Sequence, residues 1–558
     1  MSVAMIHAES TSSVGKVHAV RMQEIGDSKE RHHSPSLVSR SKFRIWGQES
    51  IASTTADSLP GNAVLTSDQI SRYGLEKDTE SGYIRWRTDS RDHPRNWSTM
   101  RKSYDTSLVL FLEFYTTVIS TTGAAAAELA LHDFSGSKMT LLVAFSLMYQ
   151  LGQAVGGLVI PPSSDLVGRR MPYLLSCALF SISCLVVGIA PHISAVFVGR
   201  FFSGLASAVP SVVVSGTVED QFNTERRVWI VLLWNAAATA GLAFGPVYAS
   251  CIMEAASWRW IFYSAAISTA ACNVLLLGIR ESRPSKLLSR KVTVLRAQYP
   301  EAELMYHTSD PFPTFRVFLD IVLVRSTVMM VTEPVLVIIS SISAVSWGII
   351  YLFTESLTAA FTELGLSRTE ASWPFLALII GVLLDAVPHI WEVKALRAKR
   401  EKKICVEPED KIFGFTYGTI ALAAGLWWFY ATSPPAMSSS HPLLPTAALI
   451  PIGFGVNEIA YTLSGYLTDT YTVYAASAFA GLAFVRAIVA GIAPLIGHVL
   501  FTETHSVVPG YVVAAVGTVF CAVPFVFYKV GRSMRERSPF AKYSVEVDRL
   551  TGLDNRDG

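Results

Sequence analysis

The sequence predicts an all-α membrane protein with twelve transmembrane helices in two bundles of six. Of its 558 residues, 51% are hydrophobic and only 16% are charged, whereas soluble proteins carry about 25% charged residues. The apolar residues form long runs of the length that a bilayer-spanning helix needs, about 20 residues. Basic residues gather in alternate connections between these runs. Together these observations argue against a soluble enzyme and against a disordered chain.

Several other classes of protein are disfavoured by composition and motifs. The net charge of +2 provides no basic field for nucleic acid. The six cysteines show no paired spacing, so we expect small core residues and neither disulfides nor a metal site. No Gly-x-x-x-x-Gly-Lys-Ser/Thr loop, Gly-x-Ser-x-Gly elbow or His-Glu-x-x-His helix occurs. We therefore expect no catalytic residues, no cofactor and no direct use of ATP.

The predicted helices follow a polar N-terminal region. Residues 1–103 are rich in charged residues and serine, and we expect a disordered cytoplasmic tail. In the first half the predicted spans are 105–125, 138–160, 171–190, 195–217, 228–251 and 258–279. In the second half they are 328–353, 371–391, 412–431, 443–466, 473–497 and 508–529. The last two spans are joined by a short loop at about 498–507.

The charge pattern sets the expected domains and orientation. Basic residues cluster at 169–170, 226–227, 280–296 and 394–403, on the same side of the predicted topology. Because lysine and arginine resist translocation, both termini are expected in the cytoplasm. The resulting domains are an N-terminal bundle at 104–280, a cytoplasmic linker at 281–327, a C-terminal bundle at 328–530 and a cytoplasmic tail at 531–558.

An internal echo supports two related halves. The residues Ala-Gly-Leu-Ala-Phe occur at 240–244 and again at 480–484, in the fifth and eleventh predicted helices. These helices would be equivalent in a protein of two repeated bundles, whose binding site lies at the bilayer midplane. A chance match of five small or apolar residues is the alternative.

Four ionisable residues inside the predicted spans are the candidates for proton coupling. They are Glu113, Arg200, Glu458 and Arg486. A charge in the middle of a transmembrane helix costs about 2.5–3.5 kcal/mol on insertion scales, so such residues are functional candidates. A buried carboxylate such as Glu113 could gain and lose a proton during a transport cycle. A fixed structural pair, or a snorkelling arginine in the case of Arg200, is the alternative.

Polar and aromatic residues of the spans are candidates for lining a substrate cavity. They are Tyr149, Gln153, Trp234, Asn235, Trp347 and Tyr351. Aromatic walls suit flat, amphipathic organic molecules. Lipid-facing or interfacial positions are the alternative, because aromatic residues are common there in any membrane protein.

The connection after the second span has the composition of a charged clasp. Asp165, Gly168, Arg169 and Arg170 follow one another in a tight turn between two helices. Glycine permits the turn, and the aspartate can pair with an arginine or cap the next helix. We interpret this connection as a gating loop that holds two helices in one state. A loop whose charges only set orientation is the alternative.

These motifs together resemble the major facilitator superfamily, and more narrowly the fungal twelve-helix drug:proton antiporters. The segment from Asp165 to Arg170 is similar to the loop signature of the superfamily, and 199–204 (Gly-Arg-Phe-Phe-Ser-Gly) to its fourth-helix arginine motif. Residues 93–98 (His-Pro-Arg-Asn-Trp-Ser) resemble the family's entry to helix 1, and 469–478 resemble a second-half motif. The resemblance covers roughly residues 92–542.

The resemblance implies a secondary active transporter that exports a drug, toxin or secondary metabolite in exchange for protons. Its implied partners are a small-molecule substrate, protons and the lipid bilayer, with a monomer in the plasma membrane. One departure from the family is the shorter loop at about 498–507, so one of the last two helices is expected to be irregular. A second departure concerns the fifth-helix antiporter signature, because Gly245-Pro246 is followed by Val247-Tyr248-Ala249-Ser250 without the expected glycines. Proton-driven uptake therefore stays open, as does a transporter-like sensor that binds its ligand without moving it.

Overall fold

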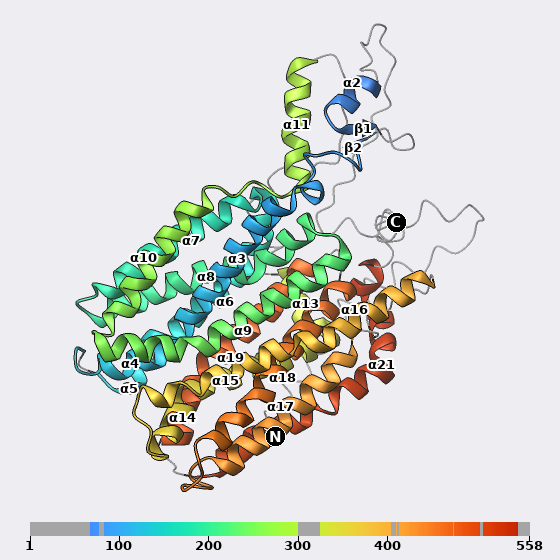
Figure 1. Cartoon of the computed structure of the whole chain (residues 1–558). Coiled ribbons are helices and arrows are strands. Elements are labelled where there is room, and N and C mark those ends of the chain that lie inside the picture. The colour runs from blue at the N-terminus through green and yellow to red at the C-terminus, as the bar shows by residue number, and fades with distance from the viewer. Residues whose placement is uncertain are drawn as a thin grey trace, which may run out of the picture. The chain divides into compact units, whose positions relative to one another are not determined.

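A computed structural model describes residues 67–77, 83–134, 136–299, 324–402, 409, 412–471, 474–502 and 506–544. All of these residues lie in one unit, Asn62–Gly558. Helices make up nearly all of the described structure, and most of them run alongside one another (Figure 1). Eleven helical stretches of the described residues are long and apolar enough to cross a membrane.

The N-terminal half contains the helices that the first six predicted spans require. The first span is divided into α3 (Thr99–Thr121) and α4 (Gly123–Ala130), and the second into α5 (Lys138–Leu142), η3 (Val143–Leu147) and α6 (Met148–Val167). The next four are α7 (Arg170–Gly188), α8 (Ile193–Gln221), α9 (Thr224–Ala255) and α10 (Arg259–Leu276). The linker contributes α11 (Pro284–Gln298).

The C-terminal half has more interrupted helices than the sequence predicted. The span expected at 328–353 is α13 (Ser326–Thr332) followed by α14 (Pro334–Glu363), because Pro334 cannot continue a helix from Glu333. The next span comprises η5 (Glu370–Ser372), α15 (Phe375–Leu384) and α16 (Ala386–Glu401). The remaining helices are α17 (Ile412–Thr432), α18 (Leu443–Thr470), α19 (Ala475–Gly497), η8 (His498–Thr502), α20 (Val508–Phe520) and α21 (Val523–Arg537). The π-turn η8 and the divided last span confirm the expected irregularity.

The predicted count of twelve membrane-spanning helices stays a prediction for the sixth span. The span expected at 258–279 is α10, which has 18 residues. It is not among the eleven stretches that are long and apolar enough to cross a membrane. The helix is so short that its whole length would have to span the membrane, with Arg259 and Asn273 included. These two polar residues lower its mean hydropathy, although the helix packs along α7 as a bundle member.

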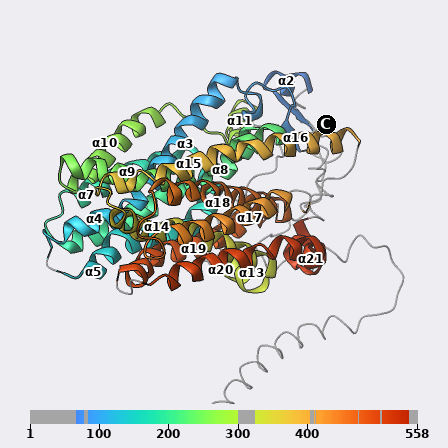
Figure 2. The same cartoon turned by 60° about the horizontal axis from the view of Figure 1, so that its bottom comes forward.

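Two pairs of helices make the most extensive contacts between the halves. Helix α6 packs against α19, and α9 packs against α15. Figure 1 shows the earlier helices, blue to green, gathered on one side and the later ones, yellow to red, on the other, and Figure 2 shows the same division after a turn. The two Ala-Gly-Leu-Ala-Phe segments lie on α9 and α19, and each of these helices packs against the first helix of its own half, α3 and α13 respectively.

The helices pack most closely where glycine faces a neighbouring backbone. A Cβ atom added at Gly204 of α8 would collide with the carbonyl oxygen of Tyr149 on α6. Small residues allow helix backbones to approach in this way, which is how helices associate in a bilayer. The close contact between α6 and α8 sets the position of Tyr149 and of the neighbouring Arg200.

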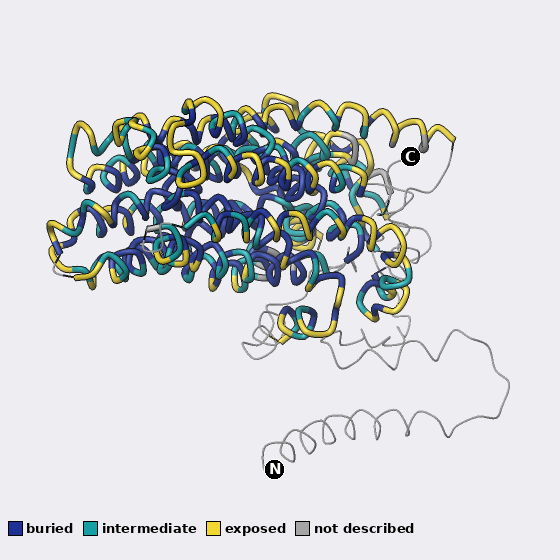
Figure 3. The backbone as a smooth tube through the Cα atoms, turned by 90° about the horizontal axis from the view of Figure 1, so that it is seen from below, coloured by how far each residue is buried: buried dark blue, intermediate teal, exposed yellow. Residues whose placement is uncertain are grey.

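The outer surface of the bundle is apolar. Large hydrophobic side chains stay exposed on the outer helices, among them Leu175 and Ile182 of α7 and Ile267 and Val274 of α10. In Figure 3 the exposed positions lie along the outer sides of the helices, while the buried ones are concentrated between them. An exposed apolar surface of this extent suits lipid contact.

The expected disordered tail is wrong for residues 67–77 and 83–98. There the chain forms α2 (Ser67–Arg72), the strands β1 (Leu75–Lys77) and β2 (Ile84–Trp86), and η2 (Pro94–Asn96). The strands are antiparallel, with Leu75 opposite Trp86. Ile70, Leu75 and Ile84 pack against Leu288, Val292 and Leu295 of α11. These apolar residues are spaced rather than contiguous, so they formed no apolar run in the sequence. Residues 99–103 begin α3, and residues 1–66 and 78–82 of the predicted tail lie outside the described residues.

Candidate functional site

A cavity of about 230 Å³ lies between the two halves of the bundle. Helices α8 and α9 form one wall, and α18 and α19 form the other. Its side chains combine aromatic rings, hydroxyls and charges, and include Trp234, Tyr461, Phe479, Ser215, Thr462, Thr468, Arg169, Glu219, Arg227 and Asp469. Apolar walls with a few polar groups are typical of sites for small organic molecules.

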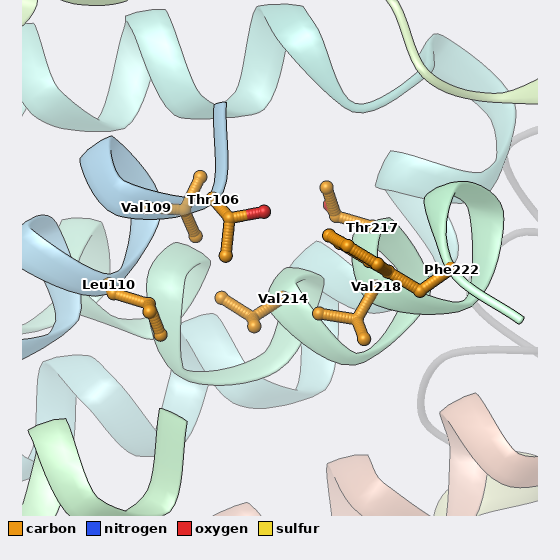
Figure 4. A pocket seen from close by; sticks show the side chains of 7 residues that line it. All are labelled: Thr106, Val109, Leu110, Val214, Thr217, Val218 and Phe222. Carbon is orange, nitrogen blue, oxygen red and sulfur yellow. The ribbon is translucent and has the colours of Figure 1, made fainter. Parts of the chain in front are cut away.

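A second, much smaller pocket lies within the N-terminal half. It has a volume of about 10 Å³ and is lined by side chains of α3 and α8, with Phe222 at the end of α8. Figure 4 shows Thr106, Val109 and Leu110 on one side and Val214, Thr217 and Val218 on the other. A space of this size holds about one water molecule. The cavity between the halves is therefore the better candidate for a substrate.

Contacts between the halves close the bundle at the end that carries α5. The hydroxyl oxygens of Ser120 on α3 and Tyr351 on α14 are 2.6 Å apart. Lys138 of α5 forms an ion pair of 3.1 Å with Glu355 of α14, and Glu128 of α4 pairs with Arg368. At the opposite end, which carries α11, the cavity is lined by Arg169, Glu219 and Arg227.

Glu113 is a buried carboxylate in the middle of α3, with 1% of its surface exposed. The hydroxyl of Ser211 on α8 lies 3.0 Å and 3.2 Å from its two oxygens and donates to it. Gln153 of α6 in turn donates to Ser211 over 3.4 Å. The indole of Trp234, which lines the cavity, lies beside the same carboxylate. Only the side chain of Trp234 thus separates Glu113 from the cavity.

Arg486 brings a positive charge from the other half. It lies on α19, and its guanidinium carbon is 4.0 Å from the centre of the Trp347 ring on α14. Its charge acts on Glu113 across the interface between the halves. A carboxylate of one half and a guanidinium of the other therefore interact electrostatically. Protonation of Glu113 would remove that attraction.

Arg200 is fully buried and is held by backbone carbonyls. It donates to the carbonyl oxygens of Phe145 (2.6 Å), Ile119 (3.3 Å) and Ser120 (3.5 Å), and lies 4.4 Å from the centre of the Tyr149 ring. Within the described ranges no carboxylate lies within ion-pair distance of Arg200. The guanidinium is instead held between the carbonyl of Phe145 in η3 and those of Ile119 and Ser120 at the end of α3, where the last helical carbonyls need donors.

The loop between α6 and α7 is tied to two neighbouring segments. Gly168 adopts a positive φ of 96°, a conformation that favours glycine. The guanidinium of Arg169 forms an ion pair of 3.1 Å with Asp220 at the end of α8, and its backbone N–H donates to Glu281 over 2.8 Å. Arg170 donates to the carbonyl oxygen of Leu277. Asp220 is therefore an acid of the clasp that the sequence did not single out. The side chain of Asp165 lies outside the described residues, so its part in the gating loop stays a prediction.

A polar cluster lies between α15, α16 and α18. Asp385, His389 and Glu458 are each at most 1% exposed. Nε2 of His389 is 3.0 Å from an oxygen of Glu458 and 3.6 Å from one of Asp385. Asn457 donates to Asp385 over 2.7 Å and accepts a hydrogen bond of 3.1 Å from Thr239 of α9. The cluster is therefore linked to the N-terminal half.

Residues 107–494, more than half of the chain, match the family described as Major Facilitator Superfamily. The chain belongs to the major facilitator superfamily. The fold agrees with this, since the D-xylose-proton symporter matches with a TM-score of 0.54 at 14% identity, over 77% of this chain and 98% of the symporter. The major facilitator fold, with its two helical bundles, is therefore the fold of this protein.

Curated relatives in the superfamily are fungal transporters. The "Ascochitine biosynthesis cluster MFS transporter" of Didymella fabae is 28% identical over 464 residues, which cover 81% of this chain and 88% of the relative. The "Citrinin biosynthesis cluster MFS transporter mrr1" of Monascus ruber is 28% identical, over 80% of this chain and 90% of the relative. The "Major facilitator superfamily multidrug transporter FLU1" of Candida albicans is 24% identical, over 81% of this chain and 75% of the relative.

Only one of the six residues that were expected to line a substrate cavity lies in the wall of the cavity between the halves. Trp234 lines the cavity. The other five lie in the packing around it: Tyr149 donates to the carbonyl of Thr116, Gln153 to Ser211, Asn235 to the carbonyl of Val231, Trp347 lies against Arg486, and Tyr351 contacts Ser120. Their contact with a substrate stays a prediction.

Sequence reasoning did not single out the histidine and the aspartate of the polar cluster. Asp385 accepts a hydrogen bond from Asn457 and lies 3.6 Å from Nε2 of His389. His389 follows Asp385 by four residues inside a predicted span, a spacing that places two side chains on one helix face. That spacing is the signal that could have identified it. The role of Glu458 in proton coupling stays a prediction.

Proposed function

We propose that this transporter exports a small amphipathic organic compound in exchange for protons, by alternating access. The observation that carries the proposal is the cavity between the halves, closed at the α5 end by three contacts that join the halves and flanked by Glu113. Rocking of the two bundles would break these contacts and open the cavity to the other side.

Glu113 is the proposed proton site and Arg486 its counterpart. The carboxylate is ionised or neutral depending on the proton, and only the ionised form is attracted to Arg486 of the other half. A proton can therefore bias two arrangements of the halves, because it changes an interaction that differs between them. One charge that crosses the membrane contributes about 2.3 kcal/mol per 100 mV. Arg200 is assigned a positioning role at the α3–α4 junction.

The lining of the cavity supports the substrate class. Trp234, Tyr461 and Phe479 offer flat apolar surfaces, while Ser215, Thr462 and Thr468 offer hydroxyls. Such a mixture suits a ring system with a few polar substituents. The printed names of the relatives point the same way, since they refer to multidrug transport and to biosynthesis clusters of secondary metabolites.

The orientation follows from the basic residues. Arg169, Arg227 and the linker lie at the α11 end, so this end is proposed to face the cytoplasm, with both termini on the same side. The cavity would then be closed on the outer side. We assign the protein to the plasma membrane as a monomer.

The test is the accumulation of fluorescent drugs and aromatic metabolites in cells that express the chain, with and without a protonophore. Lower accumulation that the protonophore abolishes supports proton-driven export. Higher accumulation would replace export by uptake, which the missing glycines after Pro246 leave open. Ligand binding without movement of the ligand, in sealed vesicles with a pH gradient, would replace transport by sensing.

A further inference from the structure

We propose that Asp385, His389 and Glu458 form a binding site for a divalent first-row transition-metal ion, with Zn²⁺ as the representative ion. Each residue offers one ligand atom, and the three atoms lie within 4.8 Å of one another. All three side chains are shielded from solvent by α15, α16 and α18. This site is independent of the proposed transport function, and its test reads metal content.

Two of the atoms that face each other have no hydrogen-bond partner. Among the described residues, Nε2 of His389 and Oε2 of Glu458, which lie 3.0 Å apart, are buried and make no hydrogen bond. Buried polar atoms are almost always satisfied, so two orphaned atoms that face each other need an explanation. The oxygen of Asp385 nearest to Nε2 is Oδ2, at 3.6 Å, and it also accepts from Asn457 over 2.7 Å. Oδ1 of Asp385 is buried without a hydrogen bond as well, and Thr462 donates to Oε1 of Glu458 over 2.9 Å.

The histidine is oriented as a metal ligand. Its Nδ1 lies 2.8 Å from a carboxylate oxygen of Glu392. Because an ionised carboxylate only accepts, Nδ1 of the neutral ring carries the proton and Nε2 presents its lone pair. A carboxylate that orients the far nitrogen of a histidine is the usual outer partner at zinc sites. The lone pair then faces Oε2 of Glu458 at 3.0 Å, and two acceptors at this distance require a cation between them.

A divalent metal satisfies this arrangement better than a proton. One proton bridges two acceptors, whereas ligand atoms of three side chains lie within 4.8 Å of one another here. Ligands at about 2.0–2.1 Å from a tetrahedral ion are about 3.3–3.5 Å apart, and the spacings from Nε2 are 3.0 Å and 3.6 Å. Two carboxylates also balance a charge of two. One imidazole and two carboxylate oxygens suit zinc or manganese, whereas calcium needs six to eight oxygens.

The ion has a route to the site. Tyr461 and Thr462 line the cavity between the halves. The Tyr461 ring centre is 4.1 Å from that of His389, and Thr462 contacts Glu458 directly. Bound metal would also fix Asp385, and with it Asn457 and its hydrogen bond from Thr239 of the other half. Metal is thus expected to favour the arrangement of the halves in which this bond exists.

The experiment measures zinc on the purified full chain in detergent. After treatment with a chelator and equilibration with ZnCl₂, the wild type is expected to hold about one tightly bound Zn²⁺ by elemental analysis. His389→Ala and Glu458→Gln should lose this ion, with affinity lowered by more than about 100-fold in competition with a chromogenic chelator. His192→Ala, which removes an exposed histidine before α8, is the matched control and should bind as the wild type does.

A second variant covers the case in which the first variants fail to fold. Glu392→Gln keeps all three ligands and should weaken zinc binding by about 10–100-fold, as the loss of an outer partner does. The proposal is overturned if the wild type holds no stoichiometric zinc or manganese, which would leave a proton between His389 and Glu458. It is equally overturned if His389→Ala and Glu458→Gln retain the ion, which would place it elsewhere, for example on the histidine pair at 32–33.

Discussion

Ser120 and Tyr351 join the two halves of the transporter through hydroxyl oxygens 2.6 Å apart, buried between α3 and α14. The Ser120 hydroxyl donates to the carbonyl of Thr117 over 3.0 Å, so Tyr351 is the donor in the bond between the halves. The backbone carbonyl of Ser120 accepts from Arg200. Arg200 therefore fixes the residue to which Tyr351 donates, which gives this buried arginine a structural role.

Tyr351→Phe should weaken closure at the α5 end. The ring remains and only the donor is lost, so we expect a cost of about 1 kcal/mol, or roughly fivefold in the equilibrium between closed and open arrangements. Spin labels at His132 and Glu363, both exposed at this end, report the distance by pulsed electron resonance. The exposed Cys251 is replaced by serine in all samples.

The control for this variant is Tyr417→Phe, which removes the hydroxyl of an exposed tyrosine on α17. It should leave the distance distribution unchanged. A distribution in Tyr351→Phe that matches the wild type would show that the Ser120–Tyr351 bond does not hold the closed end.

Glu113→Gln should uncouple transport from the pH gradient while the protein stays folded. Glutamine has nearly the same shape, and its amide oxygen can accept from Ser211 as the carboxylate does. It has no charge to lose, so a proton can no longer change the interaction with Arg486. Proteoliposomes with an imposed pH gradient measure the effect, and Glu254→Gln, an exposed carboxylate at the end of α9, is the control. Drive by the pH gradient at the wild-type level in Glu113→Gln would eliminate Glu113 as the proton site.

Asp220→Asn should destabilise the protein more than the neighbouring change Glu219→Gln. The Asp220–Arg169 pair is largely buried, with side chains 14% and 10% exposed, and the variant removes one carboxylate from a largely buried guanidinium. We expect a cost of about 1–3 kcal/mol. Glu219 is 60% exposed and 3.8 Å from Arg227, so its loss should cost about 0–1 kcal/mol. Thermal midpoints in detergent compare the two, and equal midpoints would assign the Arg169 charge to orientation alone.

His93 should make the folded N-terminal segment sensitive to acid. Burial, together with the charges of Arg95 and Lys102, lowers the pKa of His93 from 6.5 to about 4, and its Nδ1 accepts from the N–H of Arg95. Above pH 6.5 the ring is neutral in both states and contributes no pH dependence. As the pH falls from 6.5 to about 4, only the unfolded segment takes up the proton, so stability is lost across this window.

Hydrogen exchange of residues 83–98 between pH 7 and pH 4.5, corrected for the intrinsic rate, measures this loss. His93→Asn should remove the pH dependence, because asparagine can accept the same hydrogen bond without titrating. Protection that is constant over this range in the wild type would contradict the assignment.

The membrane helices could be predicted because hydropathy is a local property, and the breaks within them only in part. Pro334 announces the end of α13, and Pro388 the break at Asp385, because a proline has no N–H for the carbonyl of Leu384. The buried partner of Asp385, Asn457, is 72 residues away and cannot be read from the sequence. The hairpin at 75–86 escaped prediction because Leu75 and Ile84 are single apolar residues in a polar stretch. Their partners Leu288 and Val292 lie on α11, whose helical spacing is visible only once the helix is known.

The candidate site shows the same division between local and nonlocal information. Hydropathy singles out Glu113 and Arg200 as costly charges inside spans, and both are indeed buried. Their partners are not readable from the sequence: the donor to Glu113 is a serine of another helix, and the partners of Arg200 are backbone carbonyls. Seryl and carbonyl groups occur throughout the chain, so only the packing of α3, α6 and α8 selects them.

Gly204→Ala should disrupt the packing of α6 on α8. The added Cβ would collide with the carbonyl oxygen and carbon of Tyr149, which belong to a helical backbone and cannot rotate away. The helices must separate, and overpacking of this kind typically costs about 1–3 kcal/mol or more. Separation would also displace Tyr149 from Arg200 and thereby loosen the junction on which Tyr351 closes.

Gly465→Ala on α18 is the matched control, because no atom lies within 4 Å of its added Cβ. There alanine should raise helix stability by up to about 1 kcal/mol. The midpoint of thermal unfolding in detergent should therefore fall for Gly204→Ala and rise for Gly465→Ala. If both midpoints move in the same direction, the α6–α8 contact is more compliant than its geometry indicates.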